Sequence, residues 1–212
     1  MTWAKETVME KLAAQRDRPG QKPNEDGEQI LTKNKIVPSE QRSKESLIPA
    51  AVLVPLVNRK DEITVLLTKR TDHLNKHAGQ ISFPGGQMDK NDCSPEHTAL
   101  RETEEEIGLT GQLIEVVGHL NDYVVGTGFL VSPIIGFIEP PFLLNPHENE
   151  VAEVFEAPLH FITHPDNFEH HTRKINGIDR SFVAIQWNER FIWGATAGIL
   201  RDLSHRLWSD VQ

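Results

Sequence analysis

Three glutamates in one short segment are the residues of this sequence best suited to carry out chemistry. Glu102, Glu105 and Glu106 lie between Thr98 and Gly108. On an α-helix, which turns about 100° per residue, Glu105 and Glu106 fall within about 60° of Glu102, so the three carboxylates share one face. Carboxylates at this spacing repel one another, and a hard divalent cation reverses that repulsion because it prefers oxygen ligands. The pattern therefore predicts a site for Mg²⁺ or Mn²⁺.

The neighbouring residues agree with a helix that has one packed side and one exposed side. Arg101 lies four residues before Glu105, the spacing at which a guanidinium pairs with a carboxylate and orients it. Glu104 points away from the three glutamates and is expected to face solvent. The stripe expected to pack against the protein is Leu100, Thr103 and Ile107. The alternative is that the glutamates only solvate a helix surface, which is the commoner use of a charge run.

The segment also carries residues that begin and end helices. Ser94 suits the N-cap, Pro95 suits the first helical position, and Gly108 suits the C-terminal end. A glycine-rich passage, Phe83-Pro84-Gly85-Gly86, lies before it. The backbone amide groups of such a passage can approach a phosphate closely.

The glycines and the helix together resemble the Nudix box, G-x5-E-x7-R-E-U-x-E-E-x-G-U, in which U is apolar. The matching residues are Gly85-Gly86, Arg101-Glu102 and Glu105-Glu106-Ile107-Gly108-Leu109. The resemblance implies an α/β fold, the Nudix-type α/β/α sandwich with a mixed β-sheet, in which a loop-helix-loop motif holds metal against a diphosphate. It also implies that Glu102 and Glu106 are the main metal ligands and that Glu105 is a further ligand or orients water.

The loop of this box departs from the pattern by one residue. Counting forward from Gly86 places Asp92 at the first acidic position, whereas counting back from Arg101 places Cys93 there. Thr103 also stands where the pattern has an apolar residue. The helical half of the motif is intact.

A second motif, from Leu66 to Gly86, resembles the signature of the coenzyme A pyrophosphatase branch, L-L-T-x-R-(S/A)-x3-R-x3-G-x3-F-P-G-G. That branch also carries the longer loop. Thr71 replaces Ser or Ala, and Asn75 replaces Arg, although Lys76 could supply the charge with a different geometry. From the residues alone, the cations of this segment could equally form a basic surface loop. With the motif, the expected substrate-binding residues are Arg70, Lys76, His77, Gly85 and Gly86.

The resemblance also directs attention to a late polar loop, Asn145–Glu150, because a glutamate from such a loop often acts as the general base in Nudix enzymes. Glu150 is the expected base and Glu148 the reserve, with an ordinary acidic loop as the alternative. The expected reaction is hydrolysis of the pyrophosphate of coenzyme A or a derivative, giving 3′,5′-ADP and 4′-phosphopantetheine. A metal ion on Glu102 and Glu106 would activate water, Glu150 or Glu105 would take its proton, and Arg101 would hold the carboxylates.

Two other functions remain open at this point. The first is pyrophosphatase activity on another nucleoside diphosphate derivative, such as ADP-ribose or NADH. The second is a Nudix-like nucleotide-binding module without catalysis, which the intact Glu102, Glu105 and Glu106 oppose. Neither His170-His171, which lacks further ligands at zinc spacing, nor Cys93, which lacks an identifiable His partner, predicts a second site.

Alternation of apolar and polar residues predicts the elements that position these side chains. A helix to about residue 14 is followed by a polar, proline-rich stretch, so residues 1–46 are interpreted as a helix with a flexible linker or extension, and residues 1–45 are expected to contribute little to the site. The Nudix domain is expected over 47–212, with a hairpin turning at Asn176-Gly177 and a closing helix at 195–208. Strands are expected at 48–57, 63–68, 113–120, 129–138 and 151–156.

Composition limits the partners. With 22 basic and 31 acidic residues the formal charge is −9, which argues against a protein that grips nucleic acid through a basic face. No apolar run reaches the roughly 18 residues that are needed to cross a membrane. The one cysteine excludes an internal disulfide and fits a reducing compartment, so a cytoplasmic enzyme with a small nucleotide substrate is expected. The sequence leaves a homodimer open.

Overall fold

A computed structural model describes residues 3–14, 47–72, 79–125, 127–175 and 178–209. The helices are α1 (Lys5–Ala14), α2 (Pro95–Ile107), α3 (Leu159–Ile162) and α4 (Ala195–Trp208), with short 3-10 turns at Gly111–Leu113 and Pro165–Asn167. The strands are β1 (Ile48–Asn58), β2 (Ile63–Arg70), β3 (Ile81–Ser82), β4 (Gly85–Gln87), β5 (Ile114–His119), β6 (Tyr123–Val124), β7 (Phe129–Ile138), β8 (Val151–Pro158), β9 (Glu169–Ile175), β10 (Ile178–Trp187) and β11 (Arg190–Trp193).

The main sheet is mixed. Its central path runs β3-β2-β1-β7-β5, and β8, β4 and β6 pair with β2, β1 and β7 respectively. β1 and β7 are parallel, whereas the other pairs in this sheet are antiparallel. β9, β10 and β11 form a separate antiparallel sheet. The expected mixed β-sheet is therefore confirmed.

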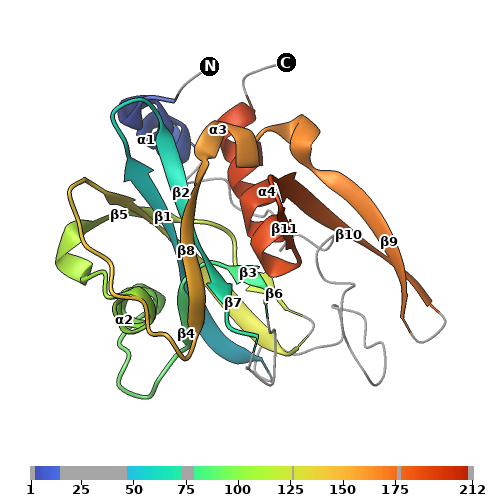
Figure 1. Cartoon of the computed structure of the whole chain (residues 1–212), viewed down its shortest axis with the longest axis horizontal. Coiled ribbons are helices and arrows are strands. Elements are labelled where there is room, and N and C mark those ends of the chain that lie inside the picture. The colour runs from blue at the N-terminus through green and yellow to red at the C-terminus, as the bar shows by residue number, and fades with distance from the viewer. Residues whose placement is uncertain (1–2, 15–46, 73–78, 126, 176–177, 210–212) are drawn as a thin grey trace.

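Two apolar clusters cover the two faces of the main sheet, with α2 on one face and α1, α4 and the small sheet on the other (Figure 1). Ala99 and Ile107 of α2 pack with Leu53 and Leu66 of the sheet. The opposite cluster joins the sheet to residues of α1, α4, β10 and β11. This arrangement confirms the expected α/β/α sandwich, and it leaves the polar side of α2 free to carry a site.

Helix α2 begins and ends where its sequence predicts. The Ser94 hydroxyl accepts a hydrogen bond from the His97 amide at 3.1 Å, and Gly108 adopts φ 72°, the left-handed conformation that favours glycine. α4 has the expected bounds, and the five expected strands are present within three residues at each end. The turn Asn176-Gly177 lies outside the described residues, although Ile175 pairs with Ile178 on either side of it.

Helix α1 packs as part of this fold. Val8 and Leu12 are buried against the same cluster as α4, and the ring of Trp3 meets the ring of Trp208 edge to face at 5.3 Å. Lys5 pairs with side chains of Glu115 and Glu139, each at 2.8 Å. The first helix of the stretch interpreted as an extension thus shares a core with residues 47–212.

Of the helices that the structure describes, none is both long and apolar enough to cross a membrane.

Candidate active site

The loop before α2 is held by a buried carboxylate, Asp92. Its oxygens accept hydrogen bonds from Arg101 Nε at 3.1 Å and Nη2 at 2.9 Å, from Thr98 Oγ1 at 3.0 Å and from the Asp89 amide at 2.8 Å. The Arg101 guanidinium is the chief reason that the pKa of Asp92 lies well below its usual range. Cys93 is exposed. Asp92, and not Cys93, is therefore the loop residue that binds Arg101.

Sequence reasoning had missed this role of Asp92. The signal that could have found it is chemical, because a carboxylate matches the fork of a guanidinium and a thiol does not.

Arg101 connects this anchor to the helical glutamates. Its Nη1 lies 2.9 Å from Glu102 Oε1 and 3.0 Å from Glu105 Oε2, and Nη2 also donates to the Gln87 carbonyl at 3.3 Å. The hydrogen bonds to Asp92, and then the contacts with the glutamates, raise the pKa of Arg101 further above its usual value. A guanidinium held at one end by a buried carboxylate fixes the carboxylates at its other end.

Glu106 lies deepest in the site, with 5% of its surface exposed. Burial raises the pKa of Glu106 to about 7, and the charges of Glu102 and Glu150 add to the rise. Arg70 and a hydrogen bond from the Gly85 amide act in the opposite direction. A carboxylate so placed binds a proton readily at neutral pH, because the proton neutralises its buried negative charge. A bound cation would neutralise that charge in the same way.

Glu102 and Glu105 differ in depth although they share a helix face. Burial raises the pKa of Glu102, against the lowering by Arg101, and the charges of Glu105 and Glu150 add to the rise. The Glu105 side chain is 60% exposed and lies at the edge of this group, in contact with Arg101. Glu104 is exposed, as its position on the helix predicts.

The two glycines of β4 lie directly beneath these carboxylates. A Cβ atom added to Gly86 would come within 2.5 Å of the Glu102 carboxylate, and one added to Gly85 would come within 2.4 Å of the Ala51 carbonyl oxygen. Gly85 is therefore needed for β4 to pair with β1, whereas a side chain at position 86 would displace the Glu102 carboxylate. Their predicted contact with a phosphate stays a prediction.

The end of β2 supplies a cation near the buried glutamate. Arg70 Nη1 lies 3.7 Å from Glu106 Oε1. The structure thus brings Arg70, predicted to bind substrate, to a predicted metal ligand. Lys76, His77 and Asn75 lie outside the described residues.

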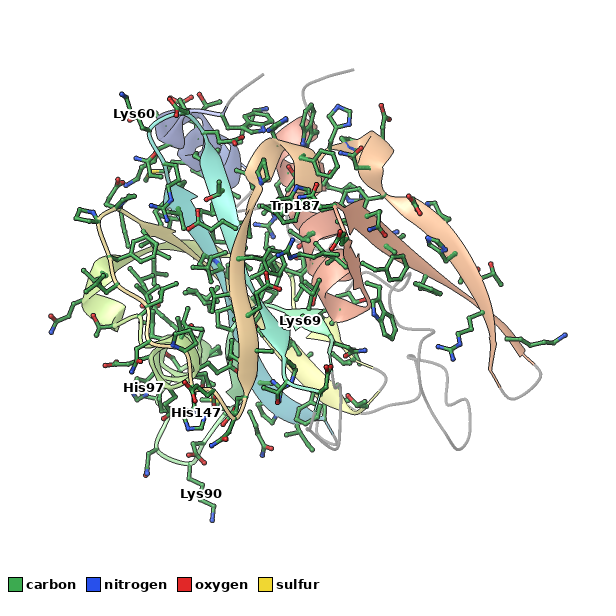
Figure 2. The ribbon with its side chains drawn as sticks, viewed as in Figure 1. Lys60, Lys69, Lys90, His97, His147 and Trp187 are labelled. Atoms are coloured by element: carbon green, nitrogen blue, oxygen red, sulfur yellow. The ribbon has the colours of Figure 1, made fainter. Side chains whose placement is uncertain are left out.

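The chain between β7 and β8 crosses the C-terminal end of α2. The Asn145 amide donates to the Ile107 carbonyl and the His147 amide donates to the Glu106 carbonyl, each at 2.8 Å. These bonds satisfy carbonyl groups that the end of a helix leaves without partners. Figure 2 shows His147 on the α2 side of the molecule and Trp187 near α4, on the other face of the sheet.

This crossing brings the expected general base to the helical glutamates. The Glu150 side chain is 48% exposed, and its charge raises the pKa of both Glu102 and Glu106. Glu148, the reserve, is exposed on the same loop. Glu150 therefore borders the carboxylate group and remains open to water.

The donor set suits a hard divalent cation. Within the part of the chain that the structure describes, no three carboxylate, imidazole or thiol side chains already converge around one metal position. Yet Glu102 and Glu106 have raised pKa values partly because neighbouring carboxylates repel them, and the donors are oxygens, as Mg²⁺ and Mn²⁺ prefer. A bound cation would offset that repulsion, so the residues fit such an ion.

Comparison with known proteins agrees with this geometry. A family profile described as "NUDIX domain" matches residues 47–180. The chain is 42% identical over 156 residues to an Escherichia coli (strain K12) protein named "Uncharacterized Nudix hydrolase NudL". This match covers 73% of this chain and 80% of that protein. It is 40% identical over 158 residues to a protein of the same name from Yersinia enterocolitica, covering 74% of this chain and 80% of the relative.

A solved structure supports the fold. The MutT/nudix family protein from Enterococcus faecalis matches with a TM-score of 0.50 and 19% identity, covering 83% of this chain and 66% of that one. At this identity the likeness concerns the fold alone.

Proposed function

Because this chain belongs to the Nudix hydrolase family, we propose that it hydrolyses the pyrophosphate of coenzyme A or its derivatives, giving 3′,5′-ADP and 4′-phosphopantetheine. The observation that carries the proposal is the position of the motif similar to the coenzyme A branch. This motif begins on β2, and the first of its two arginine positions, Arg70, lies 3.7 Å from the buried carboxylate of Glu106. A residue at that position can reach the oxygens of a diphosphate brought to the carboxylates.

In this proposal, Glu102 and Glu106 hold the divalent cation, and Glu105 is an additional ligand from its more exposed position. When bound, Mg²⁺ or Mn²⁺ neutralises the diphosphate and lowers the pKa of water. Arg101 keeps Glu102 and Glu105 oriented through its bonds to Asp92. Arg70 adds a positive charge beside the phosphates, where negative charge accumulates as the bond breaks.

Glu150 is the proposed general base. The water oxygen attacks one phosphorus of the anhydride, the bond from that phosphorus to the bridging oxygen breaks, and the proton of water passes to the Glu150 carboxylate. The side chain of Glu150 is half exposed, so water reaches it, and its backbone is held close to α2 by the crossing loop. Glu105 is the alternative base.

One residue favours a second substrate class. Asn75 stands where the coenzyme A branch has an arginine, which removes a permanent charge suited to a phosphate. Weaker recognition of the 3′-phosphate of coenzyme A would leave ADP-ribose or NADH as comparable substrates.

A nucleotide panel tests the proposal. Purified protein is incubated with coenzyme A, dephospho-coenzyme A, ADP-ribose or NADH and with Mg²⁺ or Mn²⁺, and the products are identified by mass spectrometry. We expect coenzyme A to be cleaved fastest, and Glu102→Gln to abolish the products. Faster cleavage of ADP-ribose or NADH would sink the substrate assignment, and binding without cleavage would favour the non-catalytic module.

The 3′-phosphate gives a sharper comparison. Dephospho-coenzyme A lacks this dianionic group, and one charge-assisted contact contributes roughly 1.5–3 kcal/mol, or about 10- to 150-fold. We expect dephospho-coenzyme A to be the poorer substrate by that factor and the gap to shrink in Lys76→Ala. Equal cleavage of both substrates, unchanged in Lys76→Ala, would leave only the broader assignment as a Nudix hydrolase.

A further inference from the structure

Thr71, the residue that follows β2, makes two hydrogen bonds to the loop that carries Glu150. Its hydroxyl donates to the Asn149 carbonyl at 2.9 Å, and its amide donates to the Glu150 carbonyl at 3.0 Å. Only 7% of the Thr71 surface is exposed. The Thr71 donors are therefore largely shielded from water, whereas the residues that accept from them, Asn149 and Glu150, are exposed.

The two acceptors lie on either side of the Glu150 Cα atom. The Asn149 carbonyl belongs to the peptide plane before Glu150, and the Glu150 carbonyl belongs to the plane after it. Because peptide units are planar, the backbone at Glu150 has only the two dihedral angles between these planes. Thr71 holds both planes, so it restrains the direction in which the Glu150 side chain leaves the backbone.

The loop itself adds the third restraint. The Glu150 and Val151 amides both donate to the His147 carbonyl at 2.9 Å, which closes a tight turn before β8. Val151 then pairs with Arg70, where the register of β2 and β8 shifts by one residue. By contrast, the Glu150 side chain is 48% exposed, so packing does little to fix its direction.

We propose that Thr71 is a positioning residue for Glu150. The Thr71 hydroxyl holds the peptide before Glu150, so that the Glu150 carboxylate faces Glu102 and Glu106. The inference rests on the proposed function in that Glu150 is the general base. Two consecutive residues at the end of β2 then contribute to the site, since Arg70, the last residue of the strand, contacts the helical carboxylate and Thr71, the residue after it, holds the loop that carries Glu150. A displacement of about 1 Å at a reacting group can lower turnover about a hundredfold.

The test removes the hydroxyl with little change in shape. Thr71→Val loses the bond to Asn149, whereas Thr71→Ser keeps a hydroxyl there. The matched control is Thr64→Val, because Thr64 lies at the other end of β2, is 9% exposed and donates to Glu156 at 2.5 Å. We expect Thr71→Val to lower kcat about tenfold to a hundredfold with KM within about twofold. Thr71→Ser and Thr64→Val should keep most of the wild-type kcat.

A double mutant separates positioning from general damage. Once Glu150→Gln has removed the base, Thr71→Val has no base left to misplace, so the pair should lose no more activity than Glu150→Gln alone. If the two losses multiply, or if Thr64→Val loses as much as Thr71→Val, Thr71 acts through the fold and the inference is wrong.

Hydrogen exchange provides a readout that needs no substrate. Faster exchange at the amides of residues 71 and 150 in Thr71→Val, absent from Thr64→Val, supports the restraint, and unchanged exchange overturns it.

If coenzyme A is not cleaved but another nucleotide is, the same variants are measured on that nucleotide, so the substrate proposal fails alone. If Glu150→Gln retains wild-type turnover, the base assignment and this inference fail together while hydrolysis itself stands.

Discussion

Two buried carboxylates serve the loop-helix-loop motif, and their pKa values move in opposite directions. Asp92, before α2, accepts hydrogen bonds from Arg101, Thr98 and an amide, and its pKa lies well below the usual range. Glu106, in the last turn of α2, lies among other carboxylates, and burial raises its pKa to about 7. Burial is thus common to both, and the partners decide the sign.

The difference separates Asp92, which anchors the loop before α2, from Glu106, the proposed metal ligand. The charge of Asp92 is already compensated by protein donors, so this carboxylate stabilises the ligand-free fold. The charge of Glu106 is only partly compensated, by Arg70 at 3.7 Å and one amide, so its ionisation works against the ligand-free fold. A cation bound from solution would supply what the protein lacks at that point.

The largest expected effect concerns turnover. Glu106→Gln and Glu102→Gln should each lower kcat/KM by orders of magnitude while the fold survives, because both remove a proposed metal ligand. Glu104→Gln is the matched control on the same helix, since Glu104 is exposed, and it should stay near the wild-type value. Steady-state kinetics and metal titration by calorimetry measure the difference. Equal losses at Glu104 and Glu102 would contradict the shared-face interpretation of the helix.

The second effect concerns stability, which should fall when Asp92 is substituted. Asp92→Asn leaves the partly buried Arg101 without its main partner and places amide hydrogens against its donors, which should cost about 2–4 kcal/mol of unfolding free energy. Urea denaturation measures this loss. Because the pKa of Asp92 is lowered, its stabilisation is present above its ordinary pKa and is lost only as the pH falls through the lowered value. A variant as stable as wild type at pH 7 would show that Glu102 and Glu105 suffice for Arg101.

The third effect is on stability at Glu106, where substitution should stabilise the fold, whereas substitution of Asp92 should destabilise it. The folded-state pKa of Glu106 is raised from 4.5 to about 7, so protonated Glu106 stabilises the fold fully below about pH 4.5, and that contribution is lost as the pH rises through about 7. Glu106→Gln stays neutral and keeps the contribution. In chelator at pH 8 the variant should be more stable than wild type, by up to about 3 kcal/mol. Thermal denaturation at pH 5 and pH 8 checks this, and an equal or lower stability of the variant at pH 8 would refute the assignment of Glu106 as an uncompensated charge.

The smallest effect should appear at the edge of the site. The Glu105 side chain is 60% exposed and is paired with Arg101, so water and the guanidinium already compensate its charge. Glu105→Gln should lower kcat no more than about tenfold and change stability by less than about 1 kcal/mol. Initial rates and urea denaturation measure both. A loss in kcat as large as that of Glu106→Gln would make Glu105 a principal ligand or the base.

How far the sequence predicts this site depends on whether a feature is local. The caps of α2 and the shared face of its glutamates depend on residues within one helix, so Ser94, Gly108 and the helical period were enough to predict them. The depth of Glu106 depends on β4 beneath it and on the loop that crosses it, whose contacts come from distant parts of the chain. Helical spacing therefore placed Glu105 and Glu106 on one face but could not distinguish an exposed from a buried carboxylate.

The loop before α2 shows a second limit. The extra residue left Asp92 and Cys93 equally placed by counting, because spacing alone does not say where a loop bulges. The choice follows from the bonds of Asp92 to Arg101 and Thr98, which require the folded loop. Thr71 is a similar case, since its partners Asn149 and Glu150 are nearly eighty residues away in the chain.

The contact between α1 and α4 sets the order in which a newly made chain can finish folding. Trp3 rests against Trp208, and α1 buries Val8 and Leu12 in a cluster that includes residues of the last helix. Since synthesis runs from the N-terminus, α1 leaves the ribosome long before α4, the helix whose Trp208 it packs against. Until α4 is made, the part of α1 that α4 covers stays exposed, and a chain that stops before α4 would present Trp3 to chaperones and proteases.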